Sequence, residues 1–211
     1  MTHSFLHRSV FIAAACMATL TRASFGSTID VTVDTSTLVG QDGGIYFQFN
    51  PGLNADPASV SITNFQIGPP GVLEPASPLN FFDGGSSGSL DANNLTIMNS
   101  TALNDYGEAL KFASTLSFDI NLNLPAQLTG NSGSELSIQL TGPDLLTPLL
   151  TQDPTGNLIV VSYDTSGAVN VLSTSADATV SAATVPEPSA LWSGLVCLLV
   201  LSIGHFRTKR D

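Results

Sequence analysis

The residue types that most often carry out catalysis occur only near the two ends of the chain. They are His3, His7, Cys16, Cys197 and His205. The segment between residues 27 and 184 has no histidine, cysteine or arginine. It therefore cannot form a nucleophile system that depends on an imidazole base, nor a zinc site built from His and Cys ligands. We predict that the protein is not an enzyme and carries no cofactor, apart from the calcium site considered next.

Oxygen ligands suited to calcium are the one metal-binding chemistry that the central segment offers. The candidates are Asp83, Asp91, Asp153 and Asp164, with loop carbonyls near Gly84, Gly85 and Gly156. No Asp-x-Asp-x-Asp-Gly loop is present, and an Asp close before a Gly is common in ordinary turns. Two interpretations of the four aspartates therefore stay open, a structural calcium site and plain turns.

Carboxylate pairs and exposed rings are the remaining candidates for chemistry. A polysaccharide hydrolase would need two carboxylates on either side of one bond, and the central glutamates are Glu74, Glu108 and Glu135. Nothing in their context pairs them, and solvated surface acids are the alternative interpretation. Glycan binding by stacking would need exposed aromatic rings, and we expect these to be Tyr46 and Tyr106. Tyr46 alternates with a phenylalanine, which places it on the opposite sheet face, where it serves either a shallow binding surface or core or edge packing.

The charge of the chain is sparse and acidic. Its 211 residues include 17 acidic and 6 basic side chains, a net charge of −11, and only 11% of the residues are charged. Soluble proteins average roughly 25%. Between residues 27 and 184 fifteen acids face a single cation, Lys111, which gives this segment a charge of −14. Nucleic acid is excluded as a partner, because it needs a clustered basic surface.

The elements that would position these residues are β-strands. Apolar and polar residues alternate between breaks rich in Gly, Pro, Asn and Asp, which is typical of half-buried strands. In residues 115–124 every second side chain is apolar, so these side chains share one face of a strand. A helix would scatter them around its circumference. The predicted strands are 29–33, 45–49, 60–67, 95–99, 109–112, 115–124, 134–141, 158–163 and 169–174. Residues 71–90 are expected to form a long irregular segment.

About nine short strands separated by turns predict an all-β fold, an antiparallel β-sandwich of jelly-roll type. The domain is large enough to be stabilised by its hydrophobic core without a disulfide. The expected core contains the aromatic residues Phe47, Phe49, Phe65, Phe112, Phe118 and Tyr163.

The N-terminus has the order of a secretory signal peptide. A short basic region around Arg8 precedes an apolar run over residues 10–20 and small residues over 23–27. This run is too short to span a membrane, so we predict export by the general secretion machinery, with cleavage after Gly26 or, alternatively, after Ala23.

The C-terminus combines three features. Residues 190–206 are apolar and just long enough for a transmembrane helix. They follow the Pro-Glu-Pro sequence of residues 186–188 and precede three cations, as the positive-inside rule expects. The cations of this membrane-stop cluster are Arg207, Lys209 and Arg210. On these grounds alone a plain C-terminal membrane anchor is one interpretation.

This order of features resembles the PEP-CTERM sorting signal of Gram-negative bacteria. In that family the signal is read by exosortase, a membrane protease-transpeptidase. The resemblance implies that Pro186, Glu187 and Pro188 form the recognition element and that the helix and basic tail are discarded after processing. Two prolines would hold this segment extended, outside the bilayer, for a partner to read.

The central segment also resembles a group of PEP-CTERM proteins. The shared features are a Phe-Gln-Phe-Asn-Pro-Gly segment, here residues 47–52, and a later Ser-Thr-Leu-Ser-Phe-Asp segment, here 114–119. That group has no assigned biochemical function, so the resemblance supports one intact domain and implies no chemistry.

We therefore expect an exported, non-enzymatic protein of the cell surface or extracellular matrix, with a membrane intermediate before sorting. Exopolysaccharide is a partner that the family resemblance implies. The alternatives are a calcium-dependent glycan-binding module, an acid-pair polysaccharide hydrolase and a plain membrane-anchored ectodomain. The predicted organisation is a signal peptide (1–26), a β-sandwich ectodomain (27–172), a Thr/Ser/Ala-rich linker (173–184) and the sorting signal (185–211).

Overall fold

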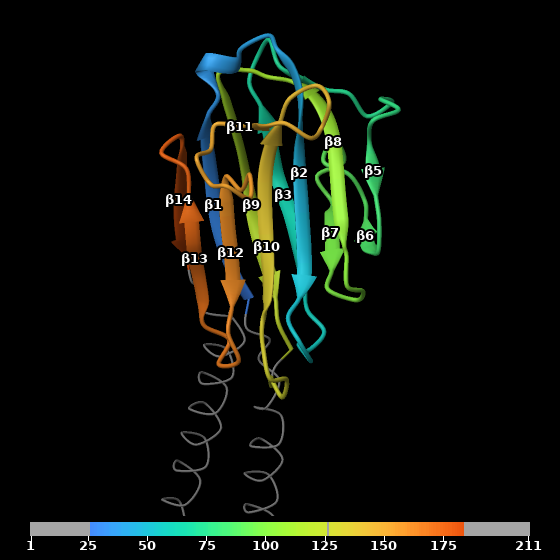
Figure 1. The fold of residues 1–211 in the computed structure, drawn as a ribbon, viewed down its shortest axis with the longest axis vertical. Helices are drawn as coiled ribbons and strands as arrows, with labels where there is room; N and C mark the ends of the chain where they lie inside the picture. The colour runs from blue at the N-terminus through green and yellow to red at the C-terminus, as the bar shows by residue number, and fades with distance from the viewer. Residues whose placement is uncertain (1–25, 126, 184–211) are drawn as a thin grey trace, which may run out of the picture. The chain divides into compact units, whose positions relative to one another are not determined.

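The computed structural model describes residues 26–125 and 127–183, which form one compact unit of two antiparallel sheets (Figure 1). Sheet A has the order β14 (Ala178–Ala183), β1 (Gly26–Asp34), β9 (Thr115–Asn123), β3 (Ser59–Ile67), β7 (Leu95–Met98) and β6 (Gly85–Ser87). Sheet B has the order β13 (Val169–Thr174), β12 (Ile159–Tyr163), β10 (Ser134–Thr141), β2 (Asp42–Pro51), β8 (Asp105–Lys111) and β4 (Val72–Leu73). In sheet B, β5 (Phe81–Phe82) also pairs with β8, and β11 (Pro148–Leu149) pairs with β10; the 3-10 helix η1 (Ser36–Leu38) follows β1.

The predicted all-β, sandwich-like fold is confirmed, and each of the nine predicted strands overlaps an observed one. In β9 the burial pattern alternates from Thr115 to Asn123, as the period of two predicts. The signal peptide, the apolar segment 190–206 and the basic tail lie outside the described residues. The described residues contain no long apolar helix able to cross a membrane.

The core lies between the two sheets and contains all six predicted aromatic residues. Phe118 of β9 lies at its centre. Its ring centroid is 5.6 Å from that of Phe47 in the facing sheet, in an edge-on arrangement, and 6.1 Å from that of Phe65 in β3. Such aromatic contacts add to the free energy gained by burying the rings.

The expected linker over residues 173–184 is wrong for most of its length. Residues 173–174 finish β13, and residues 178–183 form β14, which pairs with β1 from Thr28 opposite Ala183 to Val33 opposite Ala178. The two strands belong to different sheets, so this turn of the chain crosses the edge of the sandwich. Small Ala, Ser and Thr residues suit an edge strand as well as a linker, and the pairing with β1 decides between them.

The strand directions define two ends of the sandwich (Figure 1). The terminal end contains Gly26 and Ala183 together with the turns after β2, β9 and β12. The far end contains η1, the loop over residues 142–158 and the turn between β13 and β14. Both ends of the described chain therefore leave the domain at the same place.

Candidate binding face

The outer face of sheet B is the most structured candidate site in the described chain. Strand register places Gln139, Tyr46 and Gly107 in one row across β10, β2 and β8, and Ser137, Gln48 and Asp105 in the next. Tyr46 is half-buried on this face, opposite in direction to the buried Phe47, as the alternation predicted. We call these six residues, together with Phe81 of β5, the Tyr46 face.

Phe81 lies directly on this face beside Tyr46. The centroids of the two rings are 5.5 Å apart and the rings are inclined by 42°. Phe81 pairs with Gly107, and a β-carbon on Gly107 would lie 2.3 Å from the Phe81 ring. A glycine is therefore required here for the phenylalanine to rest on the sheet. Phe81 falls in the segment that we expected to be irregular, and its place in the site was missed.

The polar side chains beside the rings bond to one another. Gln48 Nε2 donates to the Tyr46 hydroxyl (3.0 Å) and to Asp105 Oδ1 (2.9 Å). Burial raises the pKa of the Tyr46 hydroxyl, and the neighbouring Asp105 carboxylate raises it further. The phenol therefore stays protonated at neutral pH. The hydrogen bonds that Gln48 makes to Tyr46 and to Asp105 hold the Tyr46 ring in one orientation.

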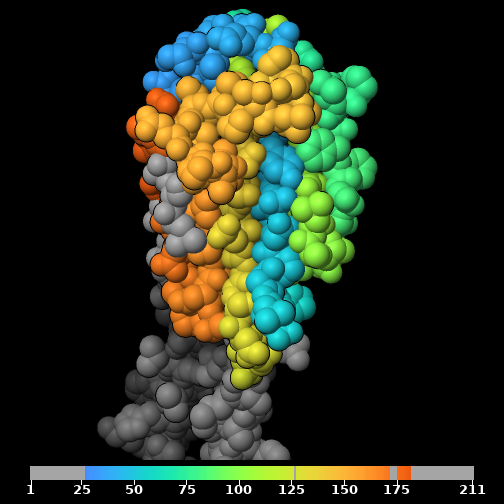
Figure 2. Space-filling model, in the orientation of Figure 1, coloured from blue at the N-terminus to red at the C-terminus, as the bar shows by residue number. Residues whose placement is uncertain are grey.

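Two segments border the Tyr46 face. The 142–158 loop, gold in Figure 2, lies above the exposed strip of β2 and β10, and the green segment that contains β5 projects along its side. The loop is fixed to the sheet where Leu145 packs over Gly44, since a β-carbon on Gly44 would lie 2.2 Å from Leu145 Cδ2. Gln139 Nε2 also donates to Asn157 Oδ1 (3.0 Å). These contacts give the face a defined edge.

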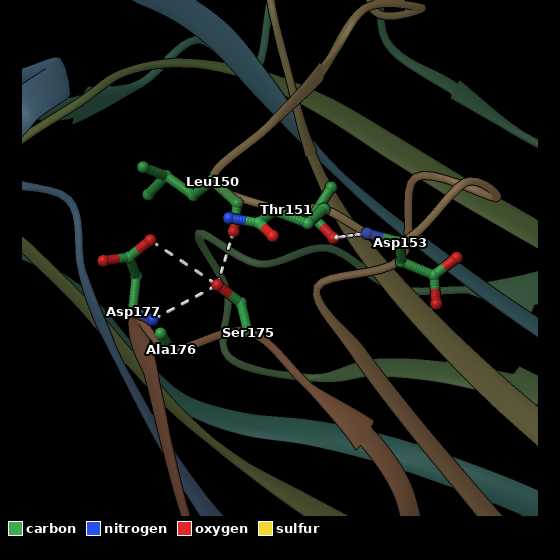
Figure 3. A pocket seen from close by; sticks show the side chains of 7 residues that line it. Leu150, Thr151, Asp153, Ser175, Ala176 and Asp177 are labelled. Carbon is green, nitrogen blue, oxygen red and sulfur yellow. Dashed lines mark hydrogen bonds between the residues drawn. The ribbon is translucent and has the colours of Figure 1, made fainter.

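A hollow lies at the far end, between the 150–153 segment and the turn after β13 (Figure 3). Its volume is about 550 Å³, and it is open to solvent. Ser175 Oγ donates to Leu150 O (2.5 Å), and the carboxylates of Asp153 and Asp177 point away from each other. Leu150 O, Asp177 Oδ2 and Asp177 N all bond to Ser175 Oγ (Figure 3), so these polar atoms are satisfied within the chain and the pocket carries no metal or substrate assignment.

The structure does not bring the four predicted calcium ligands together. Asp83 and Asp91 lie at opposite ends of β6, while β12 separates Asp153 from Asp164. Each carboxylate accepts hydrogen bonds from its own turn, for example Asp164 Oδ1 from Ser166 N (2.8 Å). No group of three or more His, Cys, Asp or Glu side chains suited to a metal occurs among residues 26–125 and 127–183.

The three glutamates are also separated. Register places Glu108 opposite Ile45, on the core side of sheet B, and Glu135 opposite Asn50, on the outer side. Glu74 is exposed just after β4. Because Glu108 and Glu135 lie on opposite faces of one sheet, they cannot flank the same glycosidic bond.

Tyr106 is not the exposed ring that the sequence suggested. It is 6% exposed and faces the core opposite Phe47, because it stands in register with a buried residue of β2. Its hydroxyl accepts from the backbone N–H of Leu90 (3.3 Å) and donates to Glu108 Oε2. Glu108 is 1% exposed and its Oε1 has no hydrogen-bond partner. Burial raises the pKa of the Glu108 carboxyl, the Tyr106 hydroxyl opposes this, and nearby Asp91 adds to the increase.

We expect Glu108→Gln to stabilise the domain at pH 7. A carboxyl whose pKa is raised by folding contributes most stability below its unfolded pKa, near 4.3, and loses it as pH rises through the folded value. Glutamine has no charge to bury, so the free energy of unfolding should increase by about 1–2 kcal/mol at pH 7. The gain should disappear below about pH 4.

Urea unfolding measured between pH 4 and 8 tests this expectation. Glu135→Gln, at an exposed position of β10, is the matched control and should leave the profile unchanged. A Glu108→Gln profile parallel to that of the natural protein would show that the Glu108 carboxyl does not titrate differently on folding.

The residues of the predicted sorting signal lie outside the described residues. These are Pro186, Glu187, Pro188, Arg207, Lys209 and Arg210. Comparisons of the chain with protein-family models, with curated proteins and with solved structures found no match.

Proposed function

We propose that the protein is an exported, non-enzymatic component of the cell surface or extracellular matrix, sorted through a C-terminal signal of PEP-CTERM type. The observation that best supports this is the position of β14. It ends at Ala183, three residues before Pro186. Cleavage next to the Pro-Glu-Pro sequence would therefore release or transfer a domain whose two sheets are complete.

The proposed route begins with the general secretion machinery and a signal peptide removed after Gly26 or Ala23. The apolar helix over residues 190–206 and the cations Arg207, Lys209 and Arg210 then hold the chain in the inner membrane of a Gram-negative cell. Exosortase reads Pro186, Glu187 and Pro188, and the domain passes to the surface or the matrix. Gly26 and Ala183, the two ends of the described domain, both lie at its terminal end.

The experiment is the mass of the C-terminal peptide of the mature protein, from native cells with and without exosortase. We expect a C-terminus near residues 186–188 only when exosortase is present. Glu187→Ala should abolish this processing, and Glu74→Ala, a change to an exposed acid of the domain, should not. A tail that ends at Asp211 in both strains would contradict the proposal and identify a plain membrane-anchored ectodomain.

Calcium-dependent glycan binding stays an alternative that can be tested directly. Thermal unfolding with excess calcium and with a chelator would reveal a structural site, and the variants Asp83→Asn, Asp91→Asn, Asp153→Asn and Asp164→Asn would locate it. The acid-pair hydrolase has no supporting geometry among the described glutamates, and an assay for turnover of the producer's own polysaccharide tests it.

A further inference from the structure

We propose that the Tyr46 face binds a neutral, hydroxyl-rich polysaccharide without the help of a metal ion. This deepens the matrix role and rests on the proposed function for its biological setting. Its physical basis is independent of the sorting signal, because every residue of the face lies in β2, β5, β8 or β10.

The aromatic part of the face suits a sugar ring. A pyranose has apolar C–H surfaces and a rim of hydroxyl groups, so it pairs with aromatic rings that lie beside polar side chains. Phe81 is 38% exposed although it packs against Tyr46, and the hydroxyl of Tyr46 lies next to Gln48. Two inclined rings at 5.5 Å form a platform wider than a single side chain.

The polar part of the face is fixed before any ligand arrives. Gln48 is held between Tyr46 and Asp105, and Asp105 is itself 6% exposed, so these groups lose little freedom on binding. The amide oxygens of the partly exposed Gln48 and Gln139 can accept hydrogen bonds from hydroxyl groups. Residues two apart on a strand repeat at about 6.6 Å, so successive rows offer contacts along an extended chain of sugars.

The charge of the domain selects among polymers. Within residues 27–184 the one cation is Lys111, which is paired with Asp42 at the far end of the sandwich, where β2 begins and β8 ends. Asp105 lies in the face and Glu135 beside it. An acidic polysaccharide, nucleic acid or anionic membrane would be repelled, whereas a neutral glycan would not. The same charge of −14 disfavours a second copy of this chain as the occupant.

Affinity gel electrophoresis tests the inference with the full chain in a mild detergent. The neutral probes are dextran, galactomannan and mixed-linkage β-glucan, and alginate is the anionic probe. We expect at least one neutral probe to retard the protein, independently of added chelator, and alginate not to. Tyr46→Ala and Phe81→Ala should each weaken this retardation about tenfold, which corresponds to about 1.4 kcal/mol.

Leu53→Ala is the matched control, because this leucine is 83% exposed in the turn after β2 and lies outside the face. Circular dichroism of each variant verifies that the fold is retained, and Phe81→Ala is the safer variant because Phe81 lies outside the core. The inference is overturned by no retardation with any neutral probe, by retardation with alginate alone, or by variants that bind like the natural protein. Sedimentation that reveals a dimer dissociated by Phe81→Ala would overturn it as well.

Failure of this experiment is distinguishable from failure of the sorting proposal. The binding assay uses purified protein and does not depend on processing, whereas the C-terminal mass depends on exosortase alone. A processed protein that binds no neutral glycan would leave the sorting proposal intact and remove the role of the Tyr46 face.

Discussion

Replacement of Phe118 by alanine is expected to lower the free energy of unfolding by about 3–5 kcal/mol. The phenylalanine is 1% exposed and contacts Phe47 of the facing sheet and Phe65 of its own. Alanine would leave a cavity between two sheets that cannot close over it without disturbing their strand pairing. Because a whole domain is stable by only about 5–15 kcal/mol, this single change should consume a large part of the total.

Urea unfolding followed by circular dichroism measures the effect of Phe118→Ala. Phe82→Ala is the control of identical chemistry, because Phe82 is 74% exposed and should cost less than about 1 kcal/mol. Equal losses for the two variants would contradict the position of Phe118 at the centre of the core.

Asn104→Ala is expected to lower the free energy of unfolding by about 2–4 kcal/mol. Asn104 is fully buried. Its Oδ1 accepts from the backbone N–H groups of Gly85 (2.9 Å) and Thr101 (3.1 Å), and its Nδ2 donates to Phe49 O (3.1 Å). Alanine would leave the buried Phe49 carbonyl and the part-buried N–H groups of Gly85 and Thr101 without this partner, and the penalty for an unpaired buried group exceeds the value of the bond itself.

The substitution Asn104→Ala should also disturb the Tyr46 face. Gly85 begins β6, three residues after β5, so the bond from Asn104 helps to hold the segment that carries Phe81. Asn170→Ala, at an exposed asparagine of β13, is the control and should change stability by less than about 0.5 kcal/mol. A loss of the same small size for Asn104→Ala would mean that water replaces its side chain at little cost.

The strands and the core could be predicted because both follow from alternation along a single strand. Leu116, Phe118 and Ile120 reveal their shared face without knowledge of any partner, and the breaks rich in Gly, Pro and Asp bound the strands. This local information was sufficient for the sandwich-like arrangement of the domain. The signal peptide, the membrane helix and the sorting signal stay predictions.

What could not be predicted depends on partners far away in the sequence. The sequence of β14 resembles a linker, because its alanines and serines form a strand only by pairing with β1, about 150 residues earlier in the chain. Phe81 enters the site because Gly107 leaves room for its ring. Tyr106 has the composition of an exposed ring, but register with Phe47 directs it inward, where its hydroxyl bonds to a buried carboxyl.

The pairing of β1 with β14 also determines how the domain would bear tension. Hydrogen bonds between antiparallel strands run perpendicular to the strand direction. A pull at Ala183 along the axis of β14 therefore stretches the bonds from Val33 to Thr28 together, in shear. A pull that separates Gly26 from Ala183 sideways would open the same pairs one after another, as a zipper opens. A domain held by its C-terminal strand and loaded through the face of sheet B would thus resist force in its stronger direction.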